Sequence, residues 1–228
     1  MNADIHMDWI FHILQEMGLA LRLPVSFVLI EFVGTFAFAL SGVRLASAKQ
    51  FDIFGAWIVG MATAIGGGTM RDIMLGVNPF WMTNSSYFIC CALAVLSVMF
   101  LGKYLIRVNN TWFIFDTIGL ALFNVIGIEK TLNMGFPYWT AITMGSITGA
   151  AGGVIRDVFI NEVPLIFRKE IYALACVAGG VVYATCHYMG LSLEINAMLS
   201  IASVVVIRML AVGYQWRLPV LKGEEQSK

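Results

Sequence analysis

The 228-residue chain has few charged residues and few of the residues that carry enzyme chemistry. Asp, Glu, Lys and Arg make up only 12% of it, against about 25% in soluble domains, which argues against a soluble class. The formal net charge is zero and no basic tract occurs, which argues against nucleic acid as a partner. The four cysteines include no Cys-x-x-Cys pair and the three histidines are scattered. We therefore expect no cofactor, and no metal beyond transient monovalent cations.

Catalytic motifs are missing as well. The chain has no His-Glu-x-x-His, no Gly-x-Ser-x-Gly and no Gly-x-x-x-x-Gly-Lys-Ser/Thr. The run 66–68 is three glycines but lacks the lysine of a nucleotide-binding loop. The sequence thus predicts a protein that is not an enzyme.

Long apolar stretches are abundant instead, in a chain that is 59% hydrophobic. A helix needs about 20 apolar residues to cross a hydrocarbon core of about 30 Å. Seven stretches meet this requirement: 26–46, 53–75, 84–104, 112–129, 137–160, 170–190 and 194–213. They predict an all-α membrane protein with seven transmembrane helices. The segment 1–25 alternates polar and apolar residues, which favours an interfacial helix, and 214–228 is expected to be a cytoplasmic tail.

Basic residues gather on one side of these spans. The loops after spans one, three and five, with the C-terminus, hold or adjoin Arg44, Lys49, Lys103, Arg107, Arg168, Lys169, Arg217, Lys222 and Lys228. The other side has little beyond Arg22 and Lys130. This bias predicts a multi-pass protein of the cell (inner) membrane, with the N-terminus outside and the C-terminus in the cytoplasm.

The chain also matches itself at an offset of 85 residues. The matched positions include Glu31 with Asp116, Gly34 with Gly119, Phe38 with Phe123, Pro79 with Pro164, Tyr87 with Tyr172, and the Gly-Gly-x-x-Arg-Asp runs 67–72 and 152–157. Three spans separate equivalent points, so the second copy enters the bilayer from the opposite side. The sequence thus predicts inverted three-helix repeats over 26–107 and 111–190, and an unpaired accessory helix over 194–213.

Glycine clusters occupy matching places in spans two and five. The candidate residues for a permeation pathway there are Gly66, Gly67, Gly68 and Thr69, and Gly149, Gly152 and Gly153. A glycine cluster is where a helix kinks or unwinds, and freed carbonyls that line a cavity are natural cation ligands. Close helix packing is the alternative interpretation of the same glycines.

Paired charges follow both clusters, as Arg71-Asp72 and Arg156-Asp157. Ionisable residues inside spans usually mark a pathway or a pair, so these two pairs are candidate guards of its two mouths. Snorkelling or pairing at the membrane interface is the alternative. Glu31 and Asp116, early in the first span of each repeat, either attract cations to opposite vestibules or favour the helix dipole.

The duplicated Gly-Gly-x-x-Arg-Asp run, with segments 34–42 and 115–119, resembles the bacterial branch of the trimeric intracellular cation channel family. Bacterial members are also described as glycine transporters. The resemblance implies a homotrimer in membrane lipid, with an hourglass pore inside each protomer that conducts potassium. It places the pore-lining kinks at Gly66, Gly67, Gly68, Gly152 and Gly153. One departure is segment 144–148, which has no Lys or Arg where animal members engage a phosphoinositide headgroup.

Two functions remain open at this point. A passive channel for potassium or other monovalent cations is the leading hypothesis. A secondary transporter for a small zwitterion such as glycine is the alternative, because inverted repeats and broken helices serve both mechanisms.

Overall fold

The computed structural model describes residues 24–107, 111–168 and 170–219. Within these ranges the chain forms seven α-helices and two single 3₁₀ turns, and its one β contact is the isolated bridge between Glu170 and Arg217. The helices are α2 (Val25–Ala48), α3 (Ile53–Met74), α4 (Ser86–Arg107), α5 (Thr111–Asn133), α6 (Tyr138–Phe159), α7 (Ala173–Tyr188) and α8 (Leu193–Gly213), with the turns η1 (Phe80–Met82) and η2 (Leu165–Phe167). The expected seven helical spans are confirmed. Of the interfacial helix expected in 1–25, residues 1–23 lie outside the described residues, and α2 already begins at Val25. Of the tail expected over 214–228, residues 220–228 lie outside them.

Local sequence accounts for the helix ends. Side chains cap the starts of α3 and α8, where Asp52 accepts from the Gly55 amide and Ser192 from the Ile195 amide. Proline precedes α2 and α6, where its missing amide costs nothing. The turns that follow α3, α5 and α7 each contain a glycine with positive φ: Gly76, Gly135 and Gly190.

The helices differ in how apolar they are. Four of them (α2, α3, α5 and α8) are long and apolar enough to cross a membrane on their own. The apolar parts of α4 and α7 are shorter, Ser86–Gly102 and Ala173–Tyr188. Helix α6 has 22 residues, as α3 has, but includes more threonine and serine. These three helices pack against the apolar four.

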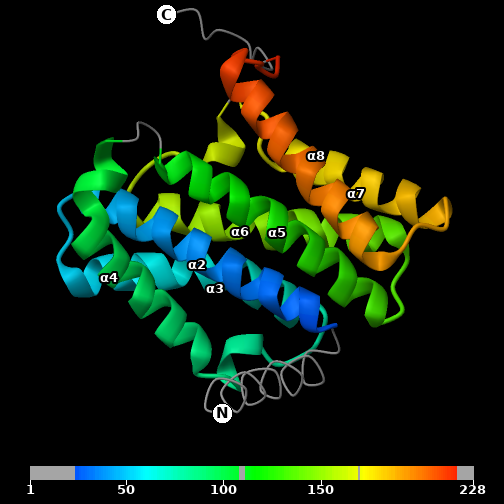
Figure 1. Cartoon of the computed structure of the whole chain (residues 1–228), viewed down its shortest axis with the longest axis horizontal. Helices are drawn as coiled ribbons and strands as arrows, with labels where there is room; N and C mark the ends of the chain where they lie inside the picture. Colours follow the sequence, from blue (N-terminus) through cyan, green and yellow to red (C-terminus); the bar gives the residue numbers. More distant parts are fainter. Residues whose placement is uncertain (1–23, 108–110, 169, 220–228) are drawn as a thin grey trace, which may run out of the picture.

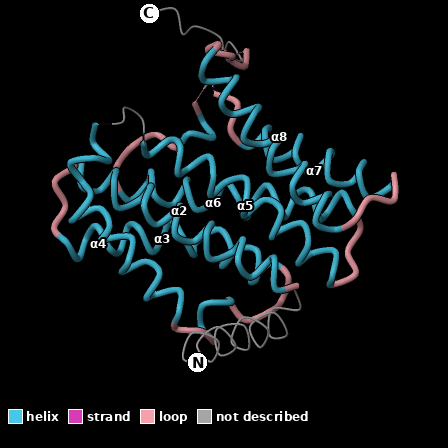
Figure 2. The backbone as a smooth tube through the Cα atoms, in the orientation of Figure 1, coloured by secondary structure: helices cyan, strands magenta, loops and turns pink. Residues whose placement is uncertain are grey.

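The two repeats interlock around a central pair of helix crossings. Helix α2 packs on α5, and α3 packs on α6; the α2–α5 pair runs through the middle of the molecule in Figure 1. Helix α4 lies against α2 and α3, and α7 lies against α6. Helix α8 covers α5 and α7, and the tube in Figure 2 shows it beside α7 at one side of the bundle.

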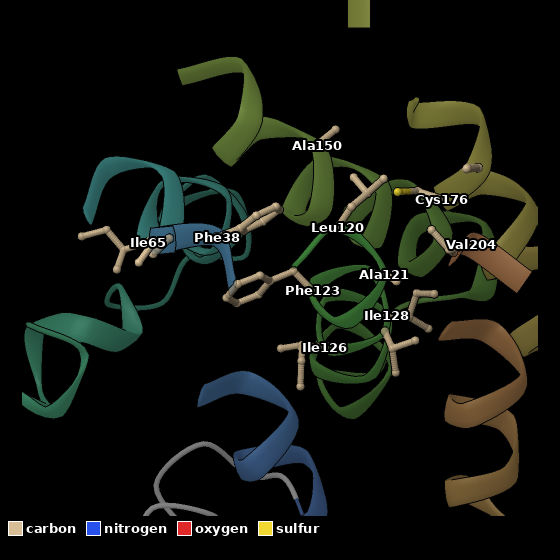
Figure 3. Close-up of a cluster of buried hydrophobic side chains, with 14 of the residues drawn as sticks. Phe38, Ile65, Leu120, Ala121, Phe123, Ile126, Ile128, Ala150, Cys176 and Val204 are labelled. Carbon is tan, nitrogen blue, oxygen red and sulfur yellow. The ribbon is translucent and has the colours of Figure 1, made fainter. Parts of the chain in front are cut away.

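The α2–α5 crossing shows that the repeats are inverted. A Cβ at Gly34 would meet Leu122 and Phe123, and one at Gly119 would meet Phe38. Rising numbers on α2 therefore face falling numbers on α5, so the two helices are antiparallel. The rings of Phe38 and Phe123, equivalent in the repeat, stack with centroids 5.3 Å apart (Figure 3). This stacked pair marks the pseudo-twofold axis.

Candidate functional site

Helices α3 and α6 touch backbone to backbone at their glycines. A Cβ built on Gly67 would lie 2.0 Å from the carbonyl oxygen of Thr148, and one on Gly152 would lie 2.2 Å from that of Thr63. These contacts are the same contact in the two repeats, since 67 and 152, like 63 and 148, differ by 85. Only glycine permits this approach, because any side chain would enter the facing backbone.

Of the two outcomes expected of a glycine cluster, a kink or an unwound turn, the unwound turn does not occur. Helices α3 and α6 are α-helical from end to end, through 66–68 and 149–153, so no unwound turn frees its carbonyls. The close crossing explains the difference, since packing compensates for the poor helix propensity of glycine. The neighbouring glycines also serve packing: Gly68 faces the Phe80 ring, Gly153 the Tyr172 hydroxyl, and Gly149 the backbone of α5.

A buried charged cluster lies where α3 ends. This first-repeat cluster consists of Glu31, Arg71, Asp72, Tyr87 and Lys130. The Arg71 Nε donates to Asp72 Oδ1 at 2.8 Å, and Lys130 Nζ lies 2.9 Å from the same oxygen. Glu31 is 1% exposed and lies in the electrostatic field of Arg71 and Lys130. The second oxygen of Asp72 accepts the Phe80 amide at 2.9 Å, so this carboxylate also fixes the turn η1.

An equivalent cluster lies where α6 ends, at the opposite end of the bundle. This second-repeat cluster consists of Asp116, Arg156, Asp157 and Tyr172. The Arg156 Nε donates to Asp157 Oδ1 at 2.9 Å, and its Nη1 donates to Asp116. The Asp157 Oδ2 accepts the Leu165 amide at 3.0 Å, which repeats the contact of Asp72 with η1.

These arginines lie in the last turns of α3 and α6 but are fully buried inside the bundle. The α3–α6 crossing is centred near Ile65 and Ala150, so Arg71 and Arg156 each lie about 9 Å from it at 1.5 Å per residue. Both side chains are 0% exposed. An arginine that snorkels to the membrane surface would be exposed at its tip, so interface snorkelling does not describe these two residues.

The two clusters differ in their partners. In the second-repeat cluster Asp116 binds Arg156 directly, and Ser41 of α2 accepts a further bond from Arg156 at 2.8 Å. In the first-repeat cluster the Arg71 Nη1 and Nη2 have no hydrogen-bond partner among the described residues. The Asp72 carboxylate is instead paired with Lys130, which comes from the other repeat. The first-repeat cluster is thus the more weakly bonded of the two.

The sequence pattern did not single out every member of these clusters. Lys130 and Ser41 reach a cluster from the opposite repeat, and no spacing in the chain connects them to it. The two tyrosines were available from the repeat itself, which pairs Tyr87 with Tyr172. Thr69, a predicted pathway residue, lies outside both clusters; its hydroxyl donates to the Ile65 carbonyl and accepts from the Trp81 indole.

A hollow of about 440 Å³ lies along α6, between α7, η2 and the end of α3. Its walls are apolar apart from Thr143 and Ser146. Met70 and Ile155 belong to these walls, and the Ile155 side chain lies against Gly66. Apart from the hydroxyls of Thr143 and Ser146, the hollow offers cations no side-chain ligands. In the described ranges, no group of three or more His, Cys, Asp and Glu residues is placed to hold a metal ion.

Comparison with known sequences identifies the repeat as a family unit. A family model described as Glycine transporter matches the chain twice, over 28–103 and 113–188. The UPF0126 inner membrane protein YadS of Escherichia coli K12 is 37% identical over 203 residues, 87% of this chain and 98% of YadS. A UPF0126 membrane protein of Vibrio cholerae is 39% identical over 226 residues, 96% of this chain and 92% of that protein.

Solved structures share the arrangement of helices. The TRIC trimeric intracellular cation channel orthologue from Rhodobacter sphaeroides superposes with a TM-score of 0.77 at 30% identity, covering 84% of this chain and 100% of that one. A TRIC cation channel whose structure addresses conductance superposes with a TM-score of 0.76 at 31% identity, covering 86% of this chain and 97% of that one. A trimeric intracellular cation channel from C. elegans, with a TM-score of 0.56 and 15% identity, shares the fold alone. Since the family model covers both repeats, the chain belongs to the Glycine transporter family of UPF0126 membrane proteins and has the seven-helix membrane fold of the bacterial TRIC channels.

Proposed function

We propose that the protein is a channel for monovalent cations, potassium foremost, with one pathway inside each protomer of a homotrimer. The pathway runs beside α3 and α6 from one charged cluster to the other, past the glycine crossing. The protomer sits in the inner membrane, with the N-terminus and the first-repeat cluster toward the outside. The C-terminus and the second-repeat cluster lie toward the cytoplasm.

The depth of the buried charges carries this proposal. Inverted repeats place their pseudo-twofold axis at the membrane midplane, so Arg71 and Arg156 lie about 9 Å to either side of it, inside a hydrocarbon core of about 30 Å. Ionisable residues at this depth are costly and mark ion or substrate pathways. Relatives with about 30% identity are themselves named cation channels, which agrees with an ion as the substrate.

The geometry suggests how the pathway opens. At the crossing, Gly67 and Gly152 hold α3 and α6 in contact, so this position is the constriction. A small separation of the two helices would expose the carbonyl oxygens of Thr63 and Thr148, each of which has a second lone pair free to face a cation. Asp116 would then exchange its Arg156 partner for the passing ion, and the Glu31 Oε2, which has no hydrogen-bond partner among the described residues, would face it at the other end.

A transporter for glycine is the second candidate, and one observation favours it. The Arg71 Nη1 and Nη2 are buried without a partner in the described part of the chain. A guanidinium with two free donors is a good ligand for the carboxylate of an amino acid. The name of the family points to the same substrate.

Recordings from purified protein in planar bilayers separate the two candidates. A channel gives unitary currents whose reversal potential in a KCl gradient follows potassium. Saturable glycine counterflow without unitary currents would refute the channel and support the transporter.

Neutral variants of the cluster acids test the pathway itself. We expect Glu31→Gln and Asp116→Asn to lower unitary conductance or cation selectivity, because each removes a carboxylate from the path. The matched control is Glu194→Gln, an exposed acid in the first turn of α8. Conductance unchanged in both cluster variants would place the pathway elsewhere.

A further inference from the structure

Arg208 is a buried charge that lies outside both repeats. It comes from α8, is 0% exposed, and lies between two aromatic rings, with its guanidinium carbon 4.9 Å from the ring centroids of Phe113 and of Tyr172. Its Nη1 donates to the Ile171 carbonyl at 2.9 Å, and Nη1 lies 3.8 Å from the Glu170 carboxylate. A snorkelling arginine would extend to the surface, whereas this one points into the bundle.

Arg208 connects to the second-repeat cluster through one side chain. Its guanidinium covers the Tyr172 ring, and the Tyr172 hydroxyl donates to Asp116 at 3.5 Å. Asp116 in turn binds Arg156. The face of an aromatic ring attracts a desolvated cation, so Arg208 holds in place the ring that supports Asp116.

The charges of the two clusters explain why a cation is needed at this position. Each repeat supplies its cluster with two carboxylates and one arginine, which leaves one excess negative charge. Lys130 supplies the missing positive charge to the first-repeat cluster at 2.9 Å from Asp72. The position equivalent to Lys130 in the first repeat is Leu45, which carries no charge. The cation packed against the second-repeat cluster is Arg208, whose other carboxylate neighbour, Glu170, is 42% exposed and is therefore screened by water.

We infer that α8 is a working part of the permeation pathway, because Arg208 balances the charge of the second-repeat cluster and positions Tyr172 against Asp116. Arg208 is a positioning residue, since it acts on the pathway through Tyr172 and through its field. This inference rests on the proposed cation channel. It assigns each mouth one balancing cation, Lys130 at one end and Arg208 at the other.

The test is the current–voltage asymmetry of single channels in symmetric KCl. Arg208→Met leaves the second-repeat cluster one unit more negative, which raises the local cation concentration at that mouth. We expect the current of cations entering from that side to rise about 1.3-fold relative to the opposite current at 0.1 M salt, and about 1.6-fold at 0.01 M. This is the effect of a unit charge acting through water over about 10 Å, reduced by a Debye length of about 10 Å at 0.1 M and about 30 Å at 0.01 M.

Two matched variants make the test specific. Lys130→Met removes the balancing cation at the other mouth, so its asymmetry should have the opposite sign. Arg208→Lys keeps the charge and should restore the wild-type ratio. Because mobile ions screen the field, both asymmetries should shrink toward the wild-type ratio at 1 M KCl; loss of packing alone would not depend on salt in this way.

The outcomes separate the inference from the proposed function. Absence of wild-type unitary currents refutes the channel. Wild-type currents with an unchanged ratio in Arg208→Met at low salt refute the role of Arg208 and leave the channel standing. If Arg208→Met does not fold, Arg208→Gln, which keeps a donor for the Ile171 carbonyl, is measured instead and decides in the same way.

Discussion

Alanine at the helix crossing should destabilise the protein, although alanine is the better helix former. A Cβ at Gly67 would lie 2.0 Å from the Thr148 carbonyl oxygen, whereas such atoms ordinarily stay about 3.3 Å apart. Helices α3 and α6 must therefore separate by about 1.3 Å. Overpacking against rigid backbone costs about 3 kcal/mol, at the upper end of its usual range, and the gain in helix propensity returns about 1 kcal/mol.

The net loss for Gly67→Ala is thus about 2 kcal/mol, or about 4–8 °C in the unfolding midpoint of a chain of this length. Gly152→Ala, its equivalent in the second repeat, should behave alike. The control is Gly66→Ala, whose Cβ would meet only the flexible end of Ile155 and whose repeat equivalent is already Ala151. Midpoints are measured by thermal unfolding in detergent. Equal midpoints for Gly66→Ala and Gly67→Ala would contradict the close crossing.

Three further substitutions probe other parts of the structure by the same assay. Asp72→Asn should cost about 3–5 kcal/mol, because it leaves buried cations without their carboxylate; a loss under 1 kcal/mol would show that this pair is not needed. Phe38→Ala should cost about 3–5 kcal/mol, because it empties the stacked site against Phe123; a negligible loss would mean that the site refills. Glu162→Gln should leave the midpoint at neutral pH nearly unchanged, because the ion pair with Lys49 is exposed. Lys49 lowers the pKa of Glu162, so any stabilisation by this pair is present at neutral pH and is lost as the pH falls below that pKa. If Glu162→Gln lowered the midpoint more in acid than at neutral pH, the direction of this pKa shift would be contradicted.

Much of the architecture followed from the chain alone. The apolar stretches located the seven helices to within a few residues, because crossing a bilayer imposes a length and a hydropathy on each span. The 85-residue offset predicted the inverted repeat, which the structure expresses as paired contacts. The same offset placed the Arg-Asp pairs at matching ends of α3 and α6, because duplicated sequence folds into duplicated local structure.

Tertiary structure alone decided what the glycines and the isolated charges do. Nothing in the run 66–68 distinguishes a helix that unwinds from one that packs closely; only the facing backbone of α6 settled that Gly67 is a contact point. The bond between Asp116 and Arg156, and the approach of Lys130 and Arg208 to opposite clusters, join residues from different helices. Sequence spacing records which residues share a helix face, but which faces meet depends on how whole helices fit together in space.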